Sequence, residues 1–150
     1  MPNNVCLDAS VIIPIITTEA LSLQADTQWR AWINTNVFPI MPPICPYEVY
    51  SVLRQKTHLR KNLSLEQEQE AQDLFLSLNI KIYSSINLLK TASNLAIELG
   101  TPTIYDTTYL ALAQMENCEF WTADHRFYNV ANPKFNFVKW LGDVQIPTDQ

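Results

Sequence analysis

Short apolar segments alternate with longer segments of helical periodicity along nearly the whole chain. Five segments of three to five residues have the apolar character of buried strands, and they lie at residues 4–7, 37–41, 80–83, 120–122 and 137–140. A helix is expected directly after residue 8, and apolar residues recur at helical spacing at residues 20–36, 46–60, 64–78, 88–99 and 106–117. This alternation predicts an α/β protein, a three-layer α/β/α sandwich with a mainly parallel central sheet.

Residues that favour helix ends mark several of these segments. Pro46 suits the first turn of a helix, because its missing N–H would have no partner there. Ser64 followed by Gln67 matches a capping box, and Gly100, one of only two glycines, suits the end of a helix. Asp106 is expected to cap the helix that begins with it. The predicted boundaries therefore rest on local chemistry as well as on periodicity.

The composition favours one soluble globular domain. Of 150 residues, 47% are hydrophobic and 17% are charged, a balance that fills one core, so residues 1–150 are expected to form a single domain. The three cysteines lack CxxC spacing, which favours free thiols in a reducing compartment. No segment approaches the ~20 apolar residues of a membrane span. A cytoplasmic protein without membrane association is therefore expected.

Four carboxylates stand where a parallel sheet gathers side chains. Asp8 and Asp124 directly follow predicted strands, whereas Glu48 and Asp106 lie in the first turns of predicted helices. Ligands of open α/β sheets bind outside the carboxyl ends of the strands, so these side chains are expected to converge there. Each residue alone has a simpler interpretation, as a helix cap, an exposed helix residue or a turn residue. The combined pattern carries the prediction.

Convergence of four carboxylates favours a divalent cation. Two carboxylates about 4 Å apart repel by roughly 4 kcal/mol at an effective dielectric constant near 20, unless one is protonated or a cation lies between them. Mg²⁺ and Mn²⁺ prefer oxygen ligands, and a water that they hold can attack a phosphodiester. Phosphodiester hydrolysis by in-line attack would suit such a site.

The formal net charge of −5 argues against a protein that binds nucleic acid mainly through Lys and Arg. It leaves open an enzyme that binds phosphates through metal ions, because bound cations invert the charge of an acidic site. Arg54, in a basic cluster after Glu48, and Arg126, two residues beyond Asp124, are candidate RNA contacts. For the cluster, a solvated helix face is the favoured alternative.

Four short motifs, in a fixed order and spacing, carry a family resemblance. They are VCLDAS at residues 5–10, PYEV at 46–49 followed by VLR at 52–54, YDTTYLALA at 105–113 and WTAD at 121–124. Over almost its whole length the chain resembles the PIN-domain nucleases, in particular the small bacterial ribonuclease toxins of VapBC toxin–antitoxin pairs. Many members have alanine where this chain has Thr107, a change that is not expected to remove activity.

The resemblance implies a catalytic acidic quartet that holds Mg²⁺ or Mn²⁺, formed by Asp8, Glu48, Asp106 and Asp124. Asp8 and Asp106 are the residues most expected to bind the metal directly. The resemblance implies cleavage of an RNA substrate, inhibition by a cognate antitoxin protein and assembly as a homodimer.

Two supporting residues and three alternatives complete the expectations. Ser10 matches a hydroxyl residue that orients water on the metal, and Asn129 stands where members often have a polar residue. A PIN-like scaffold could bind RNA or protein without cleavage, although four acids argue against it, and a DNA nuclease could use the same site. An aspartyl phosphatase is disfavoured, because that chemistry usually needs a second Asp at the position of Ser10.

Overall fold

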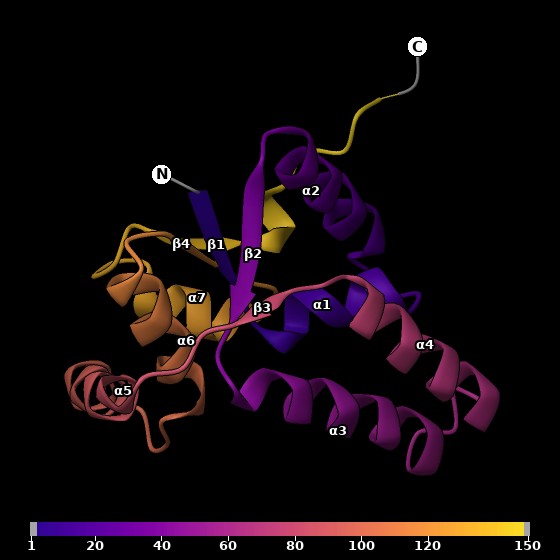
Figure 1. Cartoon of the computed structure of the whole chain (residues 1–150), viewed down its shortest axis with the longest axis horizontal. Coiled ribbons are helices and arrows are strands. Elements are labelled where there is room, and N and C mark those ends of the chain that lie inside the picture. The colour runs from indigo at the N-terminus through magenta and orange to yellow at the C-terminus, as the bar shows by residue number, and fades with distance from the viewer. Residues whose placement is uncertain (1–2, 149–150) are drawn as a thin grey trace.

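The computed structural model describes residues 3–148, which form a five-stranded sheet with helices on both faces (Figure 1). The strands are β1 Asn3–Leu7, β2 Val37–Met41, β3 Lys81–Ile82, β4 Glu119–Thr122 and β5 Val138–Trp140. They lie in the order β3-β2-β1-β4-β5, and every neighbouring pair is parallel. The predicted three-layer α/β/α sandwich is confirmed.

Seven α-helices lie within the described residues. They are α1 Ala9–Ile16, α2 Ser22–Asn34, α3 Ile44–His58, α4 Leu65–Ser77, α5 Ile86–Leu99, α6 Tyr105–Met115 and α7 His125–Ala131. Helices α1 to α4 pack together on one face of the sheet, and α5 to α7 lie on the other (Figure 1). Right-handed crossovers produce this division, because the chain first steps outward to β3 and then returns past β1 to β4. Between residues 3 and 148, no helix has the length and apolar content needed to span a membrane.

The central strand β1 is buried on both faces. Val5, Cys6 and Leu7 are at most 1% exposed, since β2 and β4 flank them and helices cover both sides of the sheet. The three cysteines of the chain are free thiols, as predicted. Leu7 lies opposite Trp121 in the parallel register of β1 and β4. The residues that follow these two strands therefore leave the sheet side by side.

Helix ends agree with the local predictions at two of the places where a cap is expected. Ser64 Oγ accepts from the Gln67 N–H at 3.0 Å, and Gln67 Oε1 accepts from the Ser64 N–H at 2.9 Å, which confirms the capping box. Gly100 ends α5 with a φ of 70°, a left-handed conformation that glycine adopts without strain. Both ends are thus determined by a few neighbouring residues.

The prediction that Asp106 caps its helix is wrong. Helix α6 begins one residue earlier, at Tyr105, and Ile104 is its N-cap residue. Asp106 therefore lies in the first turn, where the helix dipole favours a negative charge but the carboxylate is not needed as a cap. Helix α7 has only seven residues and is not predicted from periodicity; Asp124 caps it by accepting from the N–H groups of Arg126 at 3.0 Å and Phe127 at 3.2 Å.

Candidate active site

The four carboxylates singled out in the sequence line one cavity at the carboxyl edge of β1 and β4. They belong to Asp8 after β1, Glu48 in α3, Asp106 in α6 and Asp124 after β4. The cavity has a volume of about 490 Å³, within the range of small-ligand sites. Its other lining residues are Ala9, Ser10, Ile13, Pro14, Glu19, Ala20, Leu21, Val52, Tyr109 and Ala123. The structure thus brings together the four acids singled out in the sequence, whose catalytic role stays a prediction.

Asp8 is the most buried of the four, with 8% of its surface exposed. Its Oδ2 accepts a hydrogen bond from the Thr122 hydroxyl at 2.6 Å. Its Oδ1 accepts from the Ser10 N–H at 3.0 Å and also from the Ser10 hydroxyl. Because donors hold both oxygens, the orientation of this carboxylate is fixed.

The same two hydroxyls connect the exits of β1 and β4. Ser10 Oγ accepts from the Ala123 N–H at 2.8 Å, and Thr122 Oγ1 accepts from the Asp124 N–H at 3.0 Å. Each hydroxyl therefore donates to Asp8 and accepts from the backbone that leads to Asp124. This network sets the position of one acid relative to the other.

Burial raises the pKa of Asp8 to about 7, from an ordinary value of 3.8. Loss of hydration is the largest cause, the hydrogen bonds from Ser10 and Thr122 act in the opposite direction, and the charges of Asp106 and Glu48 raise the pKa further. The pKa of Asp106 is also raised, first by partial burial and then by the charges of Asp124 and Glu48. The carboxylates therefore lie within range of one another's charge, a repulsion that a bound cation would relieve.

Tyr109 orients Glu48 across the cavity. Its hydroxyl donates to Glu48 Oε1, and its side chain is 1% exposed in α6, three residues after Asp106. Burial raises the pKa of Tyr109 far above its ordinary value, and the neighbouring Cys45 and Glu48 add to the effect. The phenol therefore stays protonated and remains a donor to Glu48.

The donor set fits a hard divalent cation. The four acids offer only carboxylate oxygens, which Mg²⁺ and Mn²⁺ prefer. In the described part of the chain, no three His, Cys, Asp or Glu side chains are grouped closely enough to surround an ion by themselves. Mg²⁺ commonly binds through one or two carboxylates and retains several waters, so two of these four acids would be enough to hold it.

The other residues singled out in the sequence lie at different distances from the cavity. Ser10 lines it. Arg126 is exposed in the first turn of α7, and Asn129 is exposed further along the same helix and is not among the lining residues. Arg54 lies outside the cavity and pairs with Glu68 of α4 at 3.0 Å. Their roles as supporting residues or RNA contacts stay predictions.

Sequence patterns alone do not single out four residues that support the cavity. Thr122 and Tyr109 lie within apolar segments, where a hydroxyl is easily taken as part of the core. Lys56 falls on the apolar stripe of α3 and is 6% exposed, and a lysine at such a position is a usable signal of a buried ion pair. Glu19 belongs to a turn and carries no such signal.

Comparison with protein families gives a match over most of the chain. The model of the PIN domain matches residues 5–133, a span that holds all four carboxylates and runs from β1 through α7. No curated protein sequence matches the chain at a significant level.

Solved structures share the fold at low sequence identity. VapBC2 from Rickettsia felis, solved with a DNA fragment from its promoter, is 19% identical with a TM-score of 0.64, over 86% of this chain and 94% of the other. PAE2754 from Pyrobaculum aerophilum is 18% identical with a TM-score of 0.61, over 87% and 86%. VapC20 from Mycobacterium tuberculosis, a toxin that cleaves the sarcin–ricin loop, is 12% identical with a TM-score of 0.60, over 85% and 95%. At these identities the likeness establishes a shared fold.

Proposed function

The chain belongs to the PIN domain family, and from this premise we propose that it is a Mg²⁺- or Mn²⁺-dependent endoribonuclease, the toxin of a toxin–antitoxin pair. The observation that carries the proposal is the gathering of four carboxylates from four separate segments in one cavity. Burial and mutual repulsion raise the pKa of Asp8 to about 7, a cost that a divalent cation would offset. The arrangement is therefore better suited to binding a metal than to stabilising the empty fold.

The four acids divide the work in this proposal. Asp8 and Asp106 would bind the metal, which supplies activation of water and of the phosphodiester for in-line attack. Glu48, held by the Tyr109 hydroxyl through Oε1, would accept the proton of the attacking water at Oε2. Asp124, fixed as the cap of α7, would orient water at the exposed side of the cavity.

The substrate and partners belong to the same proposal. RNA is supported by the described activity of VapC20, which shares the fold, and Arg126, exposed in the first turn of α7, would contact a phosphate beside the cavity. A cognate antitoxin is supported by the VapBC2 structure, whose fold this chain also shares. A homodimer is proposed on the family resemblance.

The direct test is cleavage of single-stranded RNA by variants of the two proposed metal ligands. Asp8→Asn and Asp106→Asn should each lower Mg²⁺- or Mn²⁺-dependent cleavage by roughly 10²-fold or more, and a chelator should abolish cleavage by the unaltered protein. Asp73→Asn, the same substitution at an exposed position of α4, is the matched control and should retain full activity. Circular dichroism checks that each variant is folded. Undiminished cleavage by purified Asp8→Asn protein would overturn the proposal.

The same assay separates the alternatives. Mn²⁺ binding in calorimetry without cleavage of any nucleic acid would favour a non-cleaving scaffold. Faster cleavage of single-stranded DNA than of RNA of the same sequence would indicate a DNA nuclease, because the site chemistry is common to both backbones.

A further inference from the structure

The cavity has an apolar part that the proposed hydrolysis does not use. Its walls there are formed by Ile13, Pro14, Ala20, Leu21 and Val52. A fifth carboxylate, that of Glu19, also lines the cavity. Its charge would repel a phosphate and therefore needs a separate explanation.

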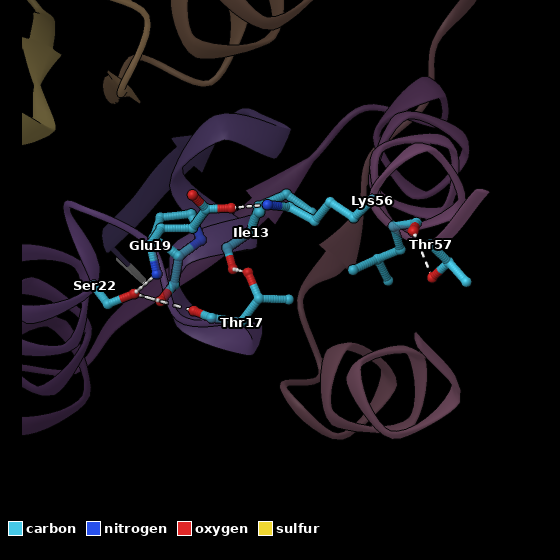
Figure 2. A network of polar contacts seen from close by, with 8 residues as sticks. Ile13, Thr17, Glu19, Ser22, Lys56 and Thr57 are labelled. Atoms are coloured by element: carbon cyan, nitrogen blue, oxygen red, sulfur yellow. Dashed lines mark hydrogen bonds and ion pairs between the residues drawn. The ribbon is translucent and has the colours of Figure 1, made fainter. Parts of the chain in front are cut away.

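Glu19 is paired with a buried lysine. Figure 2 shows Glu19, in the turn between α1 and α2, and Lys56, on α3, extending toward each other. Lys56 Nζ donates to Glu19 Oε1. The Lys56 side chain is 8% exposed and that of Glu19 is 34% exposed. The pair is therefore closed to solvent at the lysine and open at the carboxylate.

The backbone of Glu19 is fixed by one hydroxyl (Figure 2). Ser22 Oγ accepts from the Glu19 N–H at 2.8 Å. Its single hydrogen is shared between the carbonyl oxygens of Pro14 at 2.7 Å and Thr17 at 3.0 Å. The Thr17 hydroxyl donates to the Ile13 carbonyl at 2.9 Å. These bonds tie the turn to the last turn of α1, so the Glu19 side chain starts from a fixed position.

The ion pair is poorly explained by stability alone. Burying a lysine and a carboxylate costs about as much as their attraction returns, and an apolar residue at position 56 would fill the α3 stripe at least as well. Its effect on the cavity is clearer: Lys56 neutralises Glu19 and leaves Oε2 as an oriented acceptor. Among residues 3–148, no side chain or N–H donates to Oε2.

We propose that Glu19 is a specificity residue that accepts a hydrogen bond from the exocyclic amino group of a base beside the scissile phosphate. This inference rests on the proposed function, since the metal at the four acids would fix the phosphate in the same cavity. The base would pack on the apolar wall that includes Leu21 and Val52. Carboxylates accept from the cytosine amino group, whereas uracil presents a carbonyl oxygen at the same position. The enzyme should therefore prefer cytosine to uracil there.

The test uses two RNAs that differ only by cytosine or uracil at one position flanking a mapped cut site. One hydrogen bond to a carboxylate predicts a ratio of kcat/KM for cytosine over uracil of about 10 to 150. Glu19→Gln should bring the ratio close to one, because an amide can donate as well as accept. Glu98→Gln, at an exposed position of α5, should leave the ratio unchanged. The inference is overturned if the ratio of kcat/KM is one in the unaltered protein, or if Glu19→Gln leaves the ratio unchanged.

A binding measurement separates this inference from the proposed function. The two RNAs carry a fluorescent label and are titrated in Mn²⁺ with the Glu48→Gln protein, which lacks the proposed proton acceptor but keeps both proposed metal ligands. Preference for cytosine that disappears in Glu48→Gln/Glu19→Gln supports the inference even if the unaltered protein cleaves nothing, a result that would overturn the proposed function alone. Cleavage without any cytosine preference would overturn the inference alone.

Lys56 acts in this scheme as a positioning residue. Lys56→Met leaves the Glu19 charge uncompensated, so KM should rise roughly threefold or more for both RNAs, with kcat changed less than about twofold. The neutral double variant Glu19→Gln/Lys56→Met should recover KM but not the cytosine preference. A purely structural lysine predicts no such recovery, and thermal unfolding checks that both variants fold. A KM that stays raised in the double variant overturns the positioning role.

Discussion

Asp8 and Asp124 leave neighbouring parallel strands at the same edge of the sheet, yet their carboxylates have different environments. Asp8 follows the central strand, is 8% exposed, and has both oxygens held by donors. Asp124 follows β4, is exposed, and uses one oxygen to cap α7. The pKa of Asp8 is raised to about 7. Both carboxylates cap the helix that follows, Asp8 at α1 and Asp124 at α7, but only that of Asp8 is costly to ionise.

The difference indicates which of the two acids depends on a cation. The carboxylate of Asp8 is desolvated because β2 and β4 flank the exit of β1 and α1 begins immediately after it. Among residues 3–148, no basic side chain forms an ion pair with Asp8, so the fold itself supplies no cation that compensates its charge. The N–H groups at the start of α7 favour a carboxylate at position 124 whether or not a metal is bound.

The largest expected effect is a difference in RNA cleavage between variants of Asp8 and Asp124. Asp8→Asn should lower kcat/KM for RNA cleavage by roughly 10²- to 10³-fold, because it removes a charge held in a desolvated, fixed site. Asp124→Asn should cost about tenfold less, since that carboxylate is solvated. Cleavage rates and Mn²⁺ affinity by calorimetry measure both. Equal losses in the two variants would show that burial does not distinguish the acids.

The second effect is on the pH dependence of stability without metal. The folded-state pKa of Asp8, about 7, lies above the ordinary 3.8, so between these values the folded protein holds a proton that the unfolded chain has lost. The stability due to this proton is fully present below about pH 4 and is lost as the pH rises to about 7, a total change of roughly 4 kcal/mol. Urea unfolding in chelator at pH 4.5 and pH 8 measures the change.

The control for this effect is the same pair of variants. Asp8→Asn should remove this component of the pH dependence and be more stable than the unaltered protein at pH 8. Asp124→Asn should keep the component. Saturating Mn²⁺ should restore stability to the unaltered protein at pH 8, because binding to the folded state alone stabilises it. Identical pH profiles for the unaltered and Asp8→Asn proteins would contradict the assignment to Asp8.

A smaller effect tests the connection between the two acids. The Thr122 hydroxyl donates to Asp8 Oδ2 and accepts from the Asp124 N–H. Thr122→Val keeps the shape of the side chain and removes both bonds, so Mn²⁺ affinity should fall about 10- to 100-fold, as for other residues that orient metal ligands. Thr103→Val, at an exposed position, should have no effect. Unchanged affinity in Thr122→Val would mean that Ser10 alone orients Asp8.

The sequence predicted the strands, and the acids that follow them, better than the detailed contacts of the cavity. Asp8 and Asp124 could be placed because each follows an apolar segment, and parallel strands bring their exits to one edge. The predicted helix began at Asp106, one residue later than α6 does, since Tyr105 and Asp106 both suit a first turn. Lys56 could be assigned to α3, but its ion pair with Glu19 joins residues 37 positions apart. Such a contact depends on packing that no local pattern encodes.

The smallest effect isolates the structural role of Asp124. Asparagine caps helices about as well as aspartate, whereas alanine does not, so Asp124→Ala should be less stable than Asp124→Asn by about 1 kcal/mol. The reason is that Asp124 Oδ1 accepts from the Arg126 and Phe127 N–H groups at the start of α7, and an amide oxygen can replace it. Urea unfolding in chelator compares the two variants without any contribution from metal. Equal stability would show that α7 does not depend on its cap, and that position 124 serves the cavity alone.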